Sequence, residues 1–167
     1  MKTLLQTIKT DHPSIIFTEG TAFSWSPSKQ TITHKSQSDK QLADWSLLHE
    51  LAHAVLDHRS YETDFALLLL EVDAWEEAKH LASNYSVQID EDHIQDCIDT
   101  YRDWLYQRST CPTCTCTSLQ QDAVTYSCFN CGATWTVTAS RFCRPYRLSG
   151  KTKTPLEALS GQPTTFM

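Results

Sequence analysis

The sequence contains no stretch of about 18 apolar residues, the length that a membrane-spanning helix needs. Its longest apolar run, residues 65–70, fits a buried helix instead. The first residues also lack the apolar core of a secretory signal peptide, because polar and charged residues interrupt them: Gln6, Thr7, Lys9 and Asp11. We therefore expect a cytoplasmic protein with no membrane partner.

Basic residues are scarce in the first two thirds of the chain. Residues 1–110 contain 9 Lys and Arg against 18 Asp and Glu, a net charge of −9 (9 − 18). Residues 111–167 contain 5 against 2, a net charge of +3 (5 − 2). Since phosphates need positive charge, a nucleic acid is expected at most on the second part, where binding would be weak.

Cysteine is almost absent before residue 111, where Cys97 stands alone, and the other six lie between 111 and 143. In a chain without a signal peptide, such clustering favours metal binding over disulfides. The composition changes at the same point. We expect a first domain over residues 1–108, a ribbon over 109–147 and a flexible tail rich in Thr, Pro, Ser and Gly over 148–167.

The apolar periodicity predicts an α+β fold. Short strands are expected at residues 14–18 and, around a turn, at 23–26 and 31–34. Helices are expected over about residues 39–56, 63–85 and 90–107. We expect a small antiparallel sheet packed on this helical layer and followed by a β ribbon.

The helix expected over residues 39–56 contains two histidines at a spacing that suits a zinc site. His49 and His53 are four residues apart, so their imidazoles share one helix face and can bind one zinc ion. Glu50 follows His49 and is the candidate general base, which would take a proton from the attacking water.

A catalytic zinc site needs a third protein ligand. Arg59 stands where the metzincin pattern requires a histidine, so that class is excluded. Glu71 lies on the apolar stripe of the next helix, where an unpaired carboxylate would be costly and zinc would be a partner. Asp73 and Glu76 are competing candidates further round the same helix.

At these residues a family resemblance appears. His49-Glu-Leu-Ala-His-Ala-Val-Leu-Asp-His58, followed by Glu71-Val-Asp-Ala-Trp75, resembles the ImmA/IrrE-type metallopeptidases and their gluzincin relatives over roughly residues 14–85. In those families a glutamate of the second helix completes the zinc site, so the resemblance implies Glu71 as the third ligand. Trp75 stands where the relatives often have a small polar residue.

Two residues after the motif are candidates for stabilising an oxyanion in the cleft. His58 is the first, although a histidine near the end of a helix is also explained by the helix dipole. Tyr61 is the second candidate. His34, in a predicted strand, could line the substrate groove, and His93 is expected at the surface.

The cysteine-rich segment contains two C-x-x-C knuckles, Cys111 with Cys114 and Cys128 with Cys131. Two such pairs predict a tetrahedral zinc site of four thiolates, as in zinc ribbons. Cys116 could replace a ligand of the first knuckle, although the spacing favours Cys111 and Cys114. Cys143 is expected to be free.

The sequence thus predicts two zinc ions, one catalytic and one structural, in an endopeptidase that acts on an intracellular protein and docks through its ribbon. One alternative is a nucleic-acid-associated protease similar to the SprT type, whose third ligand is, however, a histidine. In that case a basic aromatic surface on the ribbon would bind single strands: Tyr126, Trp135, Arg141, Phe142, Arg144, Tyr146 and Arg147. The other alternative is a catalytically inert, zinc-stabilised adaptor for protein interactions.

Overall fold

The computed structural model describes residues 2–35 and 39–138, and its chain divides into two compact units. Among the described residues, the first unit comprises 2–35, 39–61 and 66–98, and the second comprises 62–65 and 99–138. The dividing point after residue 98 falls inside a helix, whereas the composition places a domain boundary after residue 108. The tail predicted over 148–167 lies outside the described residues.

The first unit contains a three-stranded sheet in the order β1-β3-β2, formed by β1 (Ile16–Glu19), β2 (Ser24–Ser26) and β3 (Thr31–His34). β2 and β3 form an antiparallel hairpin, but β1 pairs with β3 in parallel. The sheet is therefore mixed and not purely antiparallel as expected. The reason is that the hairpin places β3 in the middle, where it runs in the same direction as β1.

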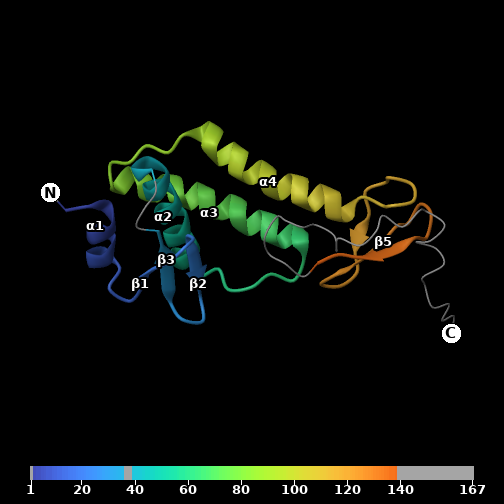
Figure 1. Ribbon diagram of the computed structural model, residues 1–167, viewed down its shortest axis with the longest axis horizontal. Helices are drawn as coiled ribbons and strands as arrows, with labels where there is room; N and C mark the ends of the chain where they lie inside the picture. The colour runs from blue at the N-terminus through green and yellow to red at the C-terminus, as the bar shows by residue number, and fades with distance from the viewer. Residues whose placement is uncertain (1, 36–38, 139–167) are drawn as a thin grey trace. The chain divides into compact units, whose positions relative to one another are not determined.

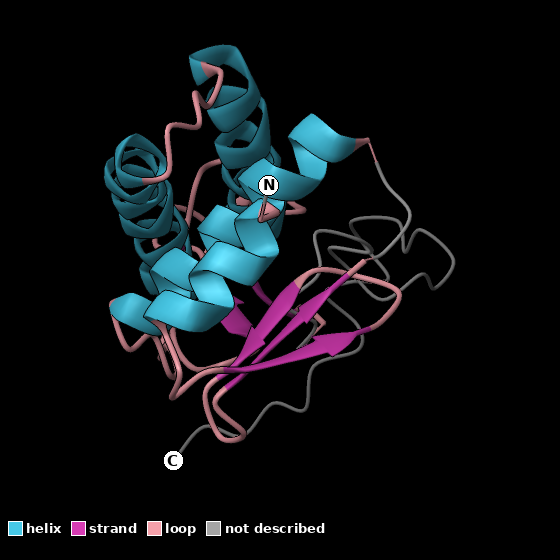
Figure 2. Cartoon of the chain, turned by 90° about the vertical axis from the view of Figure 1, so that its left-hand side faces the viewer, coloured by secondary structure: helices cyan, strands magenta, loops and turns pink. Residues whose placement is uncertain are grey.

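The described part of the chain contains four helices besides its strands, which confirms the α+β class (Figures 1 and 2). The three longer ones follow the sequence expectations closely: α2 (Lys40–Val55), α3 (Asp64–Asn84) and α4 (Glu91–Ser109). Asp39 caps α2 by accepting hydrogen bonds from two backbone amides, and Asp90 accepts one at the start of α4. α1 (Leu4–Asp11) was not expected, although Thr3 and Gln6 form a capping box at its start.

The core of the first unit lies where α2 and α3 meet the sheet. Ile32 from the central strand is fully buried, and so are Leu48 and Leu51 from α2. Small residues of α3 allow close helix packing, since Ala74 and Ala78 are also fully buried. This packing holds the motif helix against α3, which carries the expected third ligand.

No helix in the described part of the chain is long and apolar enough to cross a membrane.

The second unit is built around a small antiparallel sheet in the order β4-β5-β6, formed by β4 (Leu119–Gln120), β5 (Thr125–Ser127) and β6 (Thr134–Thr136). The first residues of α3 and the last residues of α4 belong to this unit. Tyr126 from β5 and Trp135 from β6 stack face to face, with their ring centroids 5.7 Å apart.

Candidate metal centres

The motif residues lie in the middle of α2, one turn apart on the same face. Leu47, Leu48, Leu51 and Ala52 are buried beside them, so the apolar residues of the motif anchor the helix while the two imidazoles remain partly accessible. The side chains of His49 and His53 are each 12% exposed. Their rings meet edge to face at a centroid distance of 4.7 Å.

Three side chains from α2 and α3 converge beside this face. His49 Nε2 lies 3.2 Å from Glu71 Oε2 and 3.2 Å from His53 Nε2. His53 Nε2 lies 3.6 Å from Glu71 Oε1. Ligand atoms around a tetrahedral zinc ion lie about 3.3 Å apart when each bond is about 2.0–2.1 Å long. The spacing and the chemistry of this donor set therefore fit one zinc ion.

The environment of Glu71 separates it from the two competing carboxylates. Glu71 is 7% exposed, whereas Asp73 and Glu76 are exposed on α3 and Glu76 pairs with Lys79 at 2.8 Å. Burial alone would raise the pKa of Glu71, but hydrogen bonds from His49 and His53 lower it to about 2. An ionised, buried carboxylate beside two imidazole nitrogens is what a third metal ligand requires.

Glu50 lies next to this group but outside it. Burial raises the pKa of its carboxyl group, which His49 and His53 lower to a smaller extent. The backbone N–H of Trp25 in β2 donates a hydrogen bond to the Glu50 carboxylate. The candidate base is thus held by an edge strand of the sheet. Sequence patterns carry no signal for this contact, because every residue except proline has a backbone N–H.

His58 is brought to the metal ligands by the end of α2. His58 Nδ1 lies 2.8 Å from His53 Nδ1, the ring nitrogen that faces away from the donor group. The backbone C=O of His58 accepts a hydrogen bond of 3.1 Å from the indole of Trp25. Burial lowers the pKa of His58, and the charge of His53 lowers it further. Tyr61 is half-buried and is not one of the residues whose donor atoms converge.

Trp75 has a role at the site that the sequence did not indicate. Its ring stacks on His49, with centroids 4.2 Å apart and planes inclined by 28°. His93 from α4 in turn contacts Trp75 and Trp45, so it is partly buried and not a surface residue as expected. His49 Nδ1 is buried without a hydrogen-bond partner among the described residues.

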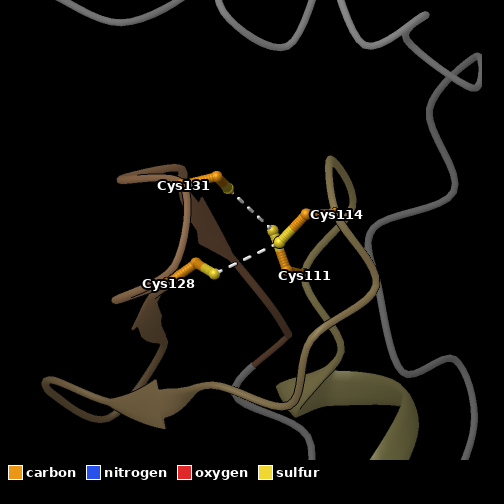
Figure 3. A group of neighbouring side chains, drawn as sticks. All are labelled: Cys111, Cys114, Cys128 and Cys131. Carbon is orange, nitrogen blue, oxygen red and sulfur yellow. Dashed lines mark hydrogen bonds between the residues drawn. The ribbon is translucent and has the colours of Figure 1, made fainter.

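The second candidate metal centre is the group of four cysteines drawn in Figure 3, which gathers Cys111, Cys114, Cys128 and Cys131. Two sulfur pairs, 111 with 131 and 114 with 128, are each 3.5 Å apart, far beyond a disulfide bond of about 2.05 Å. Thiolates around a zinc ion lie about 3.8 Å apart for bonds of about 2.3 Å. The geometry therefore fits one metal ion held by two knuckles.

Local backbone and polar contacts support the two knuckles. The side chain of Asn130 and a backbone amide at Cys116 hydrogen-bond to the Cys114 sulfur and lower its pKa to about 6. Gly132 has a φ of +74°, a conformation that favours glycine, directly after the second knuckle. The thiol of Cys116 is exposed and lies outside the group of four.

Several predicted features of the ribbon fall outside the described residues. These are Cys143 and five members of the basic aromatic surface: Arg141, Phe142, Arg144, Tyr146 and Arg147. Of its other two members, Trp135 is half-buried, and Tyr126 is buried and is therefore not part of an exposed surface as expected.

The chain matches no protein-family model, no curated protein and no solved structure. The function of this chain is therefore inferred from the geometry of the two centres.

Proposed function

We propose that this chain is a zinc-dependent endopeptidase of the HExxH type that hydrolyses an intracellular protein. The observation that carries the proposal is the convergence of His49 Nε2, His53 Nε2 and the two oxygens of the Glu71 carboxylate, with contacts of 3.2–3.6 Å and Glu50 beside them. Two histidines and one glutamate are the protein ligands of a known class of catalytic zinc sites, which leave one coordination position open.

The proposed zinc ligands are His49, His53 and Glu71. A zinc ion held there would supply a Lewis acid that polarises the peptide carbonyl and lowers the pKa of a bound water. Glu50 would accept the proton of the attacking water and pass it to the leaving amine. Its raised pKa suits both steps, because a group that must take and return a proton works best when its pKa approaches the working pH.

The sheet offers a place for an extended substrate. β2 lies at an edge of the sheet, and β3 is its central strand. Trp25 of this edge strand donates its backbone N–H to Glu50, so β2 runs beside the proposed base. A peptide that adds to the free edge of β2 would pass the catalytic group, with main-chain hydrogen bonds holding it in an extended form.

The four-cysteine group supports a second, structural zinc ion in the ribbon. A module with so small a core depends on metal for its folding, because its buried residues alone supply too little stabilisation. We propose that this ribbon docks the protein substrate.

The variant Glu50→Gln tests the proposal, because it keeps the size of the side chain and removes the base. We expect hydrolysis of an unfolded protein such as labelled casein to fall by about 100-fold or more, while zinc stays bound. Glu91→Gln, an exposed position on α4, is the matched control and should leave the rate unchanged. Full activity of Glu50→Gln would contradict the mechanism. A wild-type protein that binds zinc but cleaves nothing would favour the inert adaptor.

A further inference from the structure

The end of α2 has a geometry that folds His58 back onto His53. The backbone N–H of His58 donates to the C=O of His53 at 3.0 Å, and the N–H of Asp57 donates to the C=O of Ala54 at 3.2 Å. Asp57 has a φ of +53°. These three features define a Schellman motif, which reverses the chain at the helix end. The same two histidines are joined a second time through their rings, at 2.8 Å between the Nδ1 atoms.

The chemistry of a metal ligand fixes the direction of this ring contact. A neutral imidazole that offers Nε2 to a metal carries its proton on Nδ1. The Nδ1–H of His53 must then be the donor, and Nδ1 of His58 must be the acceptor. His58 consequently carries its own proton on Nε2.

The position of His58 does not depend on this ring contact alone. Its C=O accepts from the indole N–H of Trp25, and its ring meets that of His53 at a centroid distance of 5.0 Å and an angle of 65°. Hydrogen bonds therefore hold both the backbone N–H and the backbone C=O of His58. His49 differs, because its Nδ1 has no hydrogen-bond partner in the described part of the chain and its ring rests on Trp75.

We propose that His58 is a positioning residue of the metal centre: it accepts the Nδ1 proton of His53 and so fixes the tautomer and ring orientation that turn His53 Nε2 toward the ion. This inference rests on the zinc ligands proposed above. It gives His58 a role that acts through His53 and needs no contact with the substrate. Partners of ligating histidines typically change metal affinity by about 10–100-fold when they are removed.

Zinc affinity measured with a competing chelator tests the proposal without any substrate. Two zinc sites contribute to the titration. The binding step that disappears in Glu71→Gln is the one that belongs to the site on α2 and α3. His58→Phe keeps a ring but removes the acceptor, and we expect zinc binding at this site to weaken by about 10–100-fold. His58→Asn places a carbonyl oxygen near the original Nδ1 and should recover most of the affinity. His80→Phe is the control, because His80 of α3 is exposed and lines a cavity of about 290 Å³ together with His58.

Wild-type affinity in His58→Phe would overturn the proposal, and so would an equal loss in His58→Phe and His58→Asn. Nitrogen-15 NMR of the histidine rings in the zinc-loaded wild type gives an independent readout that requires no variant. We expect the proton of His58 on Nε2 and that of His53 on Nδ1; a proton on Nδ1 of His58 would overturn the proposal. Failure of the proposed function gives different results. In that case the wild type would bind no zinc at the site on α2 and α3, or Glu50→Gln would keep full activity.

Discussion

Arg108 and Asp64 form a two-pronged ion pair inside the second unit. Arg108 Nε donates to Asp64 Oδ2 at 2.5 Å, and Nη2 donates to Oδ1 at 3.2 Å. The two side chains are 1% and 4% exposed. Tyr126 donates its hydroxyl to the same carboxylate at 2.6 Å, and Trp104 lies against the guanidinium at 4.5 Å. This network connects the start of α3, the end of α4 and β5 within one unit.

The variant Asp64→Asn tests the energetic weight of this network. It leaves the buried guanidinium of Arg108 without its counter-charge, so we expect the free energy of unfolding to fall by about 3–5 kcal/mol. The exposed pair of Arg102 and Asp99 provides the comparison, and Asp99→Asn should cost less than about 1 kcal/mol. Urea unfolding of the zinc-loaded protein measures both. Equal losses in the two variants would show that burial of the pair has no energetic consequence.

Gly20 and Thr33 approach each other so closely that a side chain at position 20 has no room. A Cβ atom there would lie 2.4 Å from Cγ2 of Thr33 on the central strand. We expect Gly20→Ala to lower the free energy of unfolding by about 1–3 kcal/mol through overpacking. Thr33→Ser removes the methyl group, so the double variant should regain most of the loss. Strictly additive losses in this double-mutant cycle would contradict the contact.

Cys114 belongs to the four-thiolate group and Cys116 does not, so we expect opposite effects on zinc binding when each is replaced. Cys114→Ser removes a sulfur that lies 3.5 Å from Cys128 and should abolish tight zinc binding by the ribbon. Cys116→Ser should retain it, because Cys116 contributes its backbone C=O to Cys111 and its thiol is exposed. The charge-transfer absorption of cobalt bound to thiolates separates the two results. Loss of this band in Cys116→Ser would place Cys116 among the ligands.

The long helices could be predicted from the sequence because two independent signals agree at their ends. α2 shows apolar periodicity together with the cap at Asp39, and α4 shows the same together with Asp90. α1 was missed because its 8 residues contain too few turns to establish a period. The parallel pairing of β1 with β3 was missed for a related reason: strands of four residues do not encode their order in a sheet.

The residues of the candidate site also fall into those that the sequence predicts and those that it does not. His49 and His53 follow from their spacing, and Glu71 follows from the cost of an unpaired carboxylate on an apolar face. The contact between His53 and His58 depends on a left-handed residue at Asp57, a position that glycine occupies in most such motifs. The sequence therefore gave no indication that the chain turns back at that point.

We propose that His49, His53 and Glu71 hold a zinc ion separate from that of the ribbon. Native mass spectrometry of the intact chain tests it most directly, by counting zinc ions in the wild type and in Glu71→Gln. We predict two ions in the wild type, one in Glu71→Gln and two in the control Glu76→Gln, whose carboxylate pairs with Lys79. A single ion in the wild type, or two ions retained in Glu71→Gln, would contradict the account.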